Sequence, residues 1–454
     1  MTVAARMGTP ESCREVLQFH KYNWLEVTMT YVILMVVCFA LLMMVRIPIP
    51  FALLASTLVY FLGADLPLDI VVVRILRSFD SFILLAIPFF VLAGKIMSEA
   101  NISDRLIRVA DLLVGRLKGS LAYVNIVVSM FFGGITGTAI SDTTAIGSIL
   151  IPTMVKEGYS KRFSAAVTAA SSTMGPIIPP SLMFIIYGSI AQVSIRDMFL
   201  AGAVPGVLVG LSQMVVVKII GFRADFPKRT VKIPVVEGVK IIAVGAPALI
   251  LPILILGSII LGVASPTEAA VIATFYTIFI ALFGYRTMKL KKLVEVFKDS
   301  AIETGSVSII IAAAALFGWV LSNEQVPQYF AQFLVDNIHN KWLILLLINL
   351  MLFILGMFMD SIPAIMIVTP VFLPLFRMLE IDPLHAGVFM SINLITGLAT
   401  PPVGCCLFAA SIISNESMEK ISWTILPFLT ANVIVVLLVT YFPFVSMFIP
   451  SLFR

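Results

Sequence analysis

Two stretches of small polar and acidic residues interrupt long apolar segments of this chain. The first is GGITGTAISD, residues 133–142, and the second is GMFMDSIP, residues 356–363. Each is followed about forty residues later by a diproline break, GPIIPP at residues 175–180 and ATPPVG at residues 399–404. A carboxylate within an apolar membrane segment is costly, so its presence indicates a functional site.

The interruptions recur at a common spacing. Pro152 lies ten residues after Asp142 and Pro370 lies ten residues after Asp360, which predicts that the two carboxylates correspond. Further pairs keep one offset of 222 residues: Pro180 with Pro402, Ser189 with Ser411, and Pro205 with Pro427. Broken helices repeated in register are typical of secondary transporters, whose binding sites lie where the broken ends meet.

Composition places the whole chain in a membrane. Of its 454 residues 60% are hydrophobic and 12% charged, and the mean hydropathy is +1.07. Continuous apolar runs of spanning length recur throughout, which predicts an all-α polytopic membrane protein rather than a barrel of alternating strands. The cysteines show no spacing typical of a metal site or a disulfide framework: Cys13, Cys38, Cys405 and Cys406.

The basic residues predict how the chain is threaded through the membrane. If 119–156 is a re-entrant hairpin, the basic groups beside it share one side with those at 223–240 and 286–298. That side is then cytoplasmic by the positive-inside rule. Counting the crossings onward from this hairpin predicts that 341–376 is a second hairpin, which opens to the exterior. The two halves of the chain are therefore expected to have opposite orientations in the membrane. Arg74 and Arg77 fall outside in this topology, against the rule.

The expected fold is therefore an inverted repeat with two re-entrant helical hairpins and two interrupted helices. A single span is expected at 303–322, after the basic stretch 286–298, and another at 421–449. The predicted divisions are a polar N-terminal extension at 1–28, scaffold helices at 29–98, an amphipathic arm at 99–118, a first hairpin and broken helix at 119–193, scaffold helices at 194–302, a spanning helix and second arm at 303–340, a second hairpin and broken helix at 341–414, and a C-terminal scaffold helix at 415–454.

The broken ends offer complementary chemistry. Glycines in 133–137 allow a tight turn. Half-helices that start near Ser141 and Asp360 would aim their N-terminal dipoles into the site and favour an anion. Carbonyls released at 175–178 and 398–400 suit a small cation. This combination predicts coupling of an anionic solute to Na⁺, although Asp142 and Asp360 could each simply cap the helix that follows.

Four motifs resemble the large membrane subunit of tripartite ATP-independent periplasmic (TRAP) transporters. They are SDTTAIG at 141–147, SSTMGPIIPPS at 171–181, AGAVPG at 201–206 and GLATPPVG at 397–404, and the similarity runs from about residue 31 to the end. The resemblance implies an elevator-type transporter of the bacterial inner membrane. It would use a sodium gradient, with no other cofactor, to import carboxylates such as C4-dicarboxylates, keto acids or sialic acids.

The resemblance also implies partners and site residues. A periplasmic solute-binding protein would deliver the substrate, and a small four-helix membrane subunit would brace the scaffold. We expect that subunit to be a separate chain, because no four-helix block precedes residue 31. No nucleic acid is expected. The implied sites are a first Na⁺ site at Thr136, Thr138, Ser141, Gly175 and Ile177, a second at Asp360, Ser361, Thr396, Gly397 and Thr400, and a substrate region at Gly137, Asp142, Ser172, Pro179, Pro180, Pro401 and Pro402.

Other functions fit parts of the pattern. A stand-alone sodium-coupled anion or citrate-type symporter would share the inverted repeat but need no binding protein. An intramembrane aspartyl protease would use Asp142 and Asp360 as an acid–base dyad, but it would not require the two diproline breaks. A channel is the third alternative, and saturable sodium-coupled flux would exclude it. The sequence offers no arginine at membrane depth to bind the substrate carboxylate, so hydroxyls and helix dipoles are expected to do so.

Overall fold

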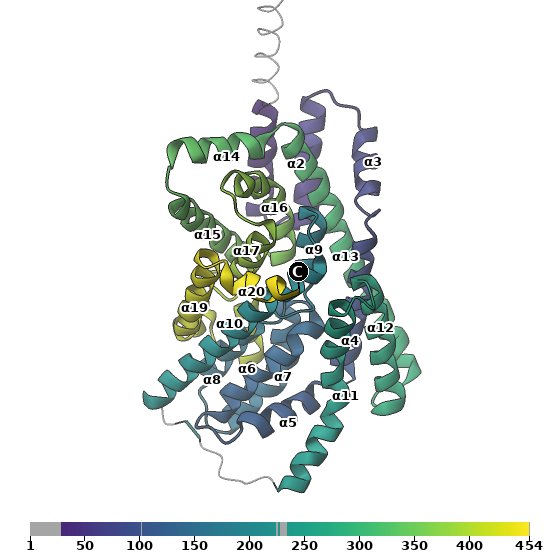
Figure 1. The fold of residues 1–454 in the computed structure, drawn as a ribbon, viewed down its shortest axis with the longest axis vertical. Coiled ribbons are helices and arrows are strands. Elements are labelled where there is room, and N and C mark those ends of the chain that lie inside the picture. Colours follow the sequence, from purple (N-terminus) through teal and green to yellow (C-terminus); the bar gives the residue numbers. More distant parts are fainter. Residues whose placement is uncertain (1–28, 101, 224–225, 228–233, 454) are drawn as a thin grey trace, which may run out of the picture.

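The chain folds into helices joined by short connections (Figure 1). The computed structural model describes residues 29–453 apart from 101, 224–225 and 228–233, with the backbone alone at 82–83 and 134–136. The predicted extension 1–28 lies outside the described residues. The helices are Met29–Met44, α2 (Ile49–Gly63), α3 (Asp69–Arg77), η1 (Phe82–Leu85), α4 (Ala86–Glu99), α5 (Ser103–Val114), α6 (Ser120–Thr136), α7 (Ala139–Lys156), α8 (Lys161–Ser172), α9 (Leu182–Ala191), α10 (Ile195–Arg223), α11 (Val235–Ile260), α12 (Pro266–Phe279), η2 (Ile280–Gly284), α13 (Leu290–Asn323), α14 (Val326–Asn337), α15 (Lys341–Phe358), α16 (Ser361–Met378), α17 (Pro383–Gly397), α18 (Cys405–Ser414), α19 (Met418–Tyr441) and α20 (Phe444–Phe453).

Seven of these helical segments, within the described part of the chain, are long and apolar enough to cross a membrane. They are α10, α11, α12 with η2, α13, α15, α16 and α19. The shorter apolar helices include the second half of each broken helix, α9 and α18. The prediction of an all-helical polytopic membrane protein is confirmed.

Two helical hairpins and two broken helices occupy the middle of the molecule. Helices α6 and α7 lie in the lower half of Figure 1, whereas α15 and α16 lie in the upper half. One broken helix is α8 and α9, and the other is α17 and α18. Helix α18 packs against α7 and α8, and α9 packs against α16 and α17. The second half of each broken helix therefore packs against the opposite repeat and joins the two.

The helix bounds correct the register of the repeat. Helices α7 and α16 both have 18 residues and begin at 139 and 361, which is the same offset of 222 that relates Pro180 to Pro402. This offset pairs Pro152 with Pro374 rather than with Pro370. It also pairs Thr138 with Asp360, so the predicted correspondence of Asp142 with Asp360 is wrong. The error arose because α16 carries two prolines one helical turn apart.

Two boundaries differ from the sequence prediction. Helix α13 starts at Leu290, so Lys291, Lys292 and Lys298 lie on its first turns instead of in a loop. Lysine is a good helix former and nothing in that stretch breaks a helix. The expected single span at 421–449 is two helices, because the chain leaves the helix at Phe442, immediately before Pro443. A residue that precedes proline is disfavoured in helical geometry.

The remaining helices form a second group. Helix α4 packs against α12 and α13, helix α2 packs against α13, and the amphipathic α5 packs against α11 and α6. Helices α10 and α19 pack against each other and against the broken helices. Helix α10 contacts α9 and α17, whereas α19 contacts α8 and α17. The division into scaffold and transport domains stays a prediction.

Candidate functional site

The tip of the first hairpin is a glycine turn followed by a hydroxyl cap. Gly137 ends α6 with φ of 71°, a left-handed conformation that glycine adopts without strain. The Thr138 hydroxyl oxygen accepts a hydrogen bond from the Ser141 backbone N–H at 3.3 Å and donates one to the Ser141 hydroxyl at 2.7 Å. Helix α7 therefore starts at Ala139, not near Ser141, and its cap is Thr138 rather than Asp142. The side chain of Thr136 lies outside the described residues.

The first hairpin packs closely on the first break. A side chain added at Gly133 would meet the Gly175 carbonyl oxygen at 3.1 Å, and one added at Gly175 would collide with the Asp142 carboxylate. Asp142 is fully buried, and so is Ile177. The predicted first-site backbone therefore lies directly against the hairpin, with a carboxylate beside it. Of the predicted substrate region, Ser172, Pro179 and Pro180 are buried, and Ser172 donates to the Thr168 carbonyl.

The tip of the second hairpin has a carboxylate as its cap. Asp360 Oδ1 accepts hydrogen bonds from the Ser361 backbone N–H at 2.6 Å and from its hydroxyl at 3.2 Å. The capping role considered for Asp360 is therefore confirmed. The second hairpin contacts the second break through two glycines, Gly356 and Gly397. The contact is so close that a side chain added at Gly397 would lie 2.5 Å from the Gly356 carbonyl carbon. Both threonine hydroxyls of the predicted second site donate to their own helix, Thr396 to the Ile392 carbonyl and Thr400 to the Thr396 carbonyl.

The start of α18 is tied to the second break and to the second hairpin. The Cys406 backbone N–H donates to the Leu398 carbonyl at 3.0 Å, and the Gly404 N–H donates to the Met357 carbonyl at 3.4 Å. The second break is thus fixed at its end, but Pro402 and Val403 at its middle are exposed.

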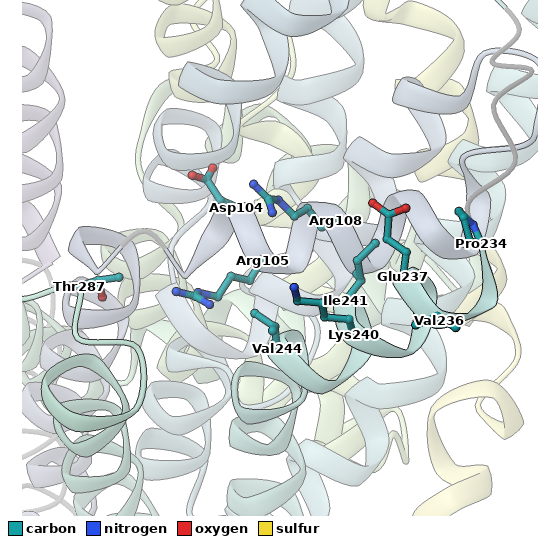
Figure 2. A pocket seen from close by; sticks show the side chains of 10 residues that line it. All are labelled: Asp104, Arg105, Arg108, Pro234, Val236, Glu237, Lys240, Ile241, Val244 and Thr287. Atoms are coloured by element: carbon teal, nitrogen blue, oxygen red, sulfur yellow. The ribbon is translucent and has the colours of Figure 1, made fainter.

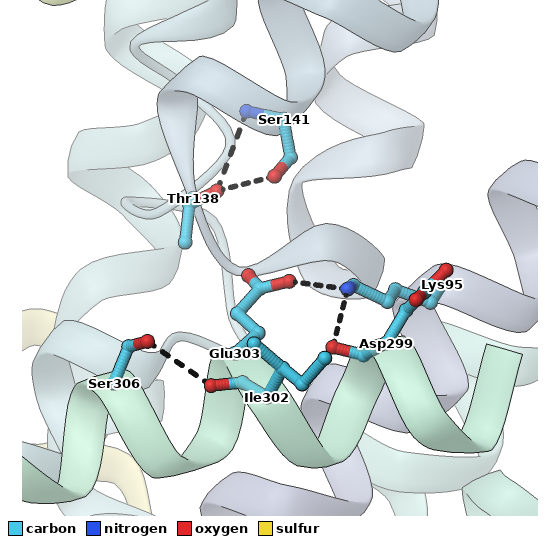
Figure 3. Close-up of polar contacts among 7 residues, drawn as sticks. All are labelled: Lys95, Thr138, Ser141, Asp299, Ile302, Glu303 and Ser306. Carbon is cyan, nitrogen blue, oxygen red and sulfur yellow. Dashed lines mark hydrogen bonds and ion pairs between the residues drawn. The ribbon is translucent and has the colours of Figure 1, made fainter.

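A cavity of about 340 Å³ lies beside the first hairpin. Ser141 and Thr144 line it from α7, and Lys95 lines it from α4. Lys95 Nζ lies 2.9 Å from the Glu303 carboxylate and donates to the Asp299 carbonyl, as Figure 3 shows. The lining also contains the carboxylates of Glu99 and Asp299. Sequence reasoning missed Lys95, which its place in an otherwise apolar run could have revealed.

A second group that sequence reasoning missed ties the first break to distant helices. The Gln213 side-chain amide donates to the Ala170 carbonyl at 2.9 Å and to the Asn432 side-chain oxygen at 3.0 Å. Asn432 in turn donates to the Thr173 hydroxyl at 3.4 Å. Both amide side chains are fully buried. Helices α10 and α19 therefore hold α8 at the point where it breaks.

Paired hairpins, broken helices that cross between repeats and carboxylates at the hairpin tips define a helical secondary transporter. The fold of the YdaH transporter of Alcanivorax borkumensis is similar, with a TM-score of 0.61 at 16% identity over 83% of this chain and 88% of that one.

Sequence comparison gives the family. The model for the DctM component of the tripartite ATP-independent periplasmic transporters matches residues 36–445. The chain is 38% identical to the isethionate TRAP transporter permease DctMQ of Oleidesulfovibrio alaskensis, over 90% of this chain and 65% of that protein. It is 36% identical to the C4-dicarboxylate TRAP transporter large permease DctM of Pseudomonas aeruginosa, over 84% and 88%. It is 34% identical to the sialic acid TRAP transporter large permease SiaM of Vibrio cholerae, over 91% and 96%.

The chain therefore belongs to the DctM family of TRAP transporter large permeases, which is the family that the sequence motifs resembled. It is a multi-pass protein of the bacterial inner membrane. The members of this family are transporters and not enzymes, so the protease alternative is excluded.

Proposed function

We propose that this chain is the sodium-coupled membrane core of a three-part uptake system for a small carboxylate. The substrate classes in the names of its relatives, isethionate, C4-dicarboxylate and sialic acid, are all small organic anions. Their anionic character supports the proposal, because the hairpin tips present helix N-termini where negative charge is favoured.

One observation carries the proposal. Each hairpin packs a glycine against the backbone of a broken helix, Gly133 on Gly175 and Gly356 on Gly397. Asp142 lies beside the first contact, and Asp360 caps the helix that follows the second. Released carbonyls and a carboxylate form a set of hard oxygen ligands, which a small cation prefers. Two such junctions next to two helix N-termini would let cations and one anion bind together.

We assign ligands to each site on this basis. The first Na⁺ would bind between Thr138, Ser141 and the backbone of Gly175 and Ile177. The second would bind at Asp360 and Ser361, with backbone oxygens near Thr396, Gly397 and Thr400. The substrate carboxylate would lie between the tips, near Gly137 and Asp142 and the two diproline segments.

The transport movement and the partners complete the proposal. The two hairpins and broken helices would move together as an elevator against the α2, α4, α12 and α13 group. A periplasmic binding protein would supply the substrate, and a separate small membrane subunit would brace the static helices. Neither partner is needed for the alternative, a stand-alone symporter.

Uptake in proteoliposomes tests the proposal. Vesicles would hold this chain and its small subunit, with a candidate binding protein and its radiolabelled carboxylate outside, and with or without an inward Na⁺ gradient. We expect saturable uptake that requires both the gradient and the binding protein. Sodium-driven uptake without any binding protein would favour the stand-alone symporter. Uptake at the same rate with and without the Na⁺ gradient, whether or not the binding protein is present, would refute sodium coupling.

A further inference from the structure

A cavity of about 740 Å³ lies away from the hairpin tips, between the amphipathic helix α5 and the start of α11 (Figure 2). Arg105 and Arg108 line it from α5, and Glu237 and Lys240 line it from α11. The predicted topology puts this end of both helices at the cytoplasmic surface, together with the basic loops.

The cavity walls are fixed by close packing. Gly245 of α11 contacts Val109 of α5, and a side chain added at Gly238 would meet Leu112 at 3.4 Å. Helix α5 is therefore held along α11 at two points. Its first turns, which carry the arginines, are presented at a constant distance from Lys240.

The cationic groups are available to a ligand. Among the residues that the structure describes, no ion pair involves Arg105, Arg108 or Lys240. The Arg105 guanidinium lies 3.7 Å from the centre of the Tyr285 ring, and the Tyr285 hydroxyl donates to the Val244 carbonyl at 2.7 Å. Stacking on a fixed ring orients the guanidinium and leaves its N–H edge free to bind an oxyanion.

The charges match one phosphodiester. Arg105, Arg108 and Lys240 supply three positive charges, and Asp104 and Glu237 supply two negative ones, so the lining has a formal charge of +1. A phosphodiester carries a single negative charge and suits the forked donors of arginine. The two carboxylates can accept hydrogen bonds from hydroxyl groups beside the phosphate.

The cavity continues into an apolar face. Val235, Val236, Val239 and Ile242 of α11 are exposed. Only 22% of the most apolar stretch of α11 is buried, the smallest share among the seven candidate spans. Acyl chains could therefore lie along α11 while the headgroup occupies the cavity. A free phosphate has no acyl chains and would make no use of this apolar face.

We propose that the cavity between α5 and α11 binds the headgroup of an anionic glycerophospholipid of the cytoplasmic leaflet, with the phosphodiester on Arg105, Arg108 and Lys240. Basic pockets between helices at this surface are suited to such headgroups. The bound lipid would fasten the arm helix α5, which leads directly into the first hairpin, to α11.

Lipid binding to the full chain tests this site. The delipidated protein would be titrated with phosphatidylglycerol, with phosphatidylcholine and with inorganic phosphate, and bound lipid would be counted by native mass spectrometry. The test variant is R105Q/K240Q. The matched control is R116Q/K289Q, which removes two exposed basic residues that do not line the cavity. The single variant Lys240→Gln, on the exposed side of α11, serves if the double variant fails to fold.

We expect phosphatidylglycerol to bind the wild type at least about tenfold more tightly than phosphatidylcholine. Both lipids share the phosphodiester, but the cationic choline group is repelled by a lining of formal charge +1 and offers no hydroxyl to Asp104 and Glu237. This preference should fall at least fivefold in R105Q/K240Q, or at least twofold in Lys240→Gln, and persist in the control. Equal preference in wild type and test variant would overturn the proposal. Binding of inorganic phosphate that depends on Arg105 and Lys240, without selective lipid binding, would overturn it in favour of a soluble phosphate ligand.

Discussion

The two hairpin units share a backbone plan but differ in their polar groups. Both use an 18-residue second helix at the same offset, and both pack a glycine on the facing break. The first unit caps that helix with Thr138 and carries its carboxylate one turn later, at Asp142. The second unit caps with Asp360 and has Ala364 at the later position. The repeat thus preserves the geometry of the two junctions while their polar side chains differ.

The surroundings of the two units differ as well. The cavity beside the first hairpin is lined by Lys95 and three carboxylates. A cavity of about 290 Å³ on the other side, between α13, α9 and α16, is lined mostly by apolar groups such as Ile186, Trp319 and Met366. The first break is buried and tied to α10 and α19, whereas the second exposes Pro402 and Val403. The two units therefore differ in the polarity and the exposure of what surrounds them.

The largest expected effect separates the two caps. In Asp360→Asn the second unit loses a charged ligand, and loss of about 3 kcal/mol of ion binding would weaken Na⁺ roughly 100-fold. Thr138→Ala removes a neutral cap worth about 1 kcal/mol, so we expect Na⁺ binding to weaken only roughly fivefold. The Na⁺ dependence of uptake in proteoliposomes measures both.

The exposed carboxylate Asp80 supplies the control for charge alone. Asp80→Asn should leave the Na⁺ dependence of uptake unchanged. Similar losses in Asp360→Asn and Thr138→Ala would mean that the two junctions are equivalent, and the contrast between them would fail.

The next effect concerns the glycine contacts. In Gly356→Ala the new methyl group would overlap the Leu394 carbonyl, and such overpacking costs about 1–3 kcal/mol of unfolding free energy. Gly133→Ala should cost less, because its nearest atoms lie at 3.1–3.2 Å and need to give only slightly. Thermal unfolding in detergent would rank the variants.

Gly305 on α13 provides a matched control, because a side chain added there meets nothing within 4 Å. Gly305→Ala should stabilise the helix by up to about 1 kcal/mol. A Gly356→Ala protein as stable as wild type would show that the second hairpin is not held by this contact.

An effect of similar size is expected for the buried amides of the first unit. Gln213→Met leaves the Asn432 side chain with one partner fewer, at a cost of about 1–3 kcal/mol in unfolding free energy. The repeat places Val435 at the matching position of α19, so the second unit has no counterpart to lose. Ser212→Ala, whose hydroxyl bonds only its own helix, should change stability by less than about 0.5 kcal/mol. Equal unfolding midpoints for Gln213→Met and Ser212→Ala would show that the buried amides do not stabilise the first unit.

Local signals account for what the sequence predicted. Glycine turns and diprolines interrupt helices wherever they occur, so both hairpins and both broken helices could be located from residues 133–142, 175–180, 356–363 and 399–404. The amphipathic pattern likewise located the arm, which was predicted at 99–118 and contains α5 at Ser103–Val114. These features depend on neighbours in the chain and need no tertiary contact.

What the sequence could not give depends on distant partners. Gln213 meets Asn432, and Lys95 meets Glu303, across more than 200 residues. The register of the hairpins was misjudged because Pro370 and Pro374 offer two alignments. The 222-residue offset of Pro180 and Pro402 favours Pro374, and the helix start at Ser361 agrees with it. Thr138 was missed as a cap because three hydroxyl or carboxylate residues follow Gly137 within five positions, and each of them could cap a helix.

The smallest effect belongs to the charged cavity of the first unit. The Lys95–Glu303 pair is about one-third exposed on both side chains, and pairs of this kind contribute about 0.2–1 kcal/mol. We expect Lys95→Gln and Glu303→Gln each to lower the unfolding midpoint slightly, and the double variant to lose no more than either alone, as a double-mutant cycle would measure. High salt should remove the difference, since it screens partly exposed charges. A coupling energy well above 1 kcal/mol that resists salt would mean that α4 and α13 are held together by this pair, and the charged cavity would then be a structural joint of the scaffold rather than a solvated space beside the hairpin.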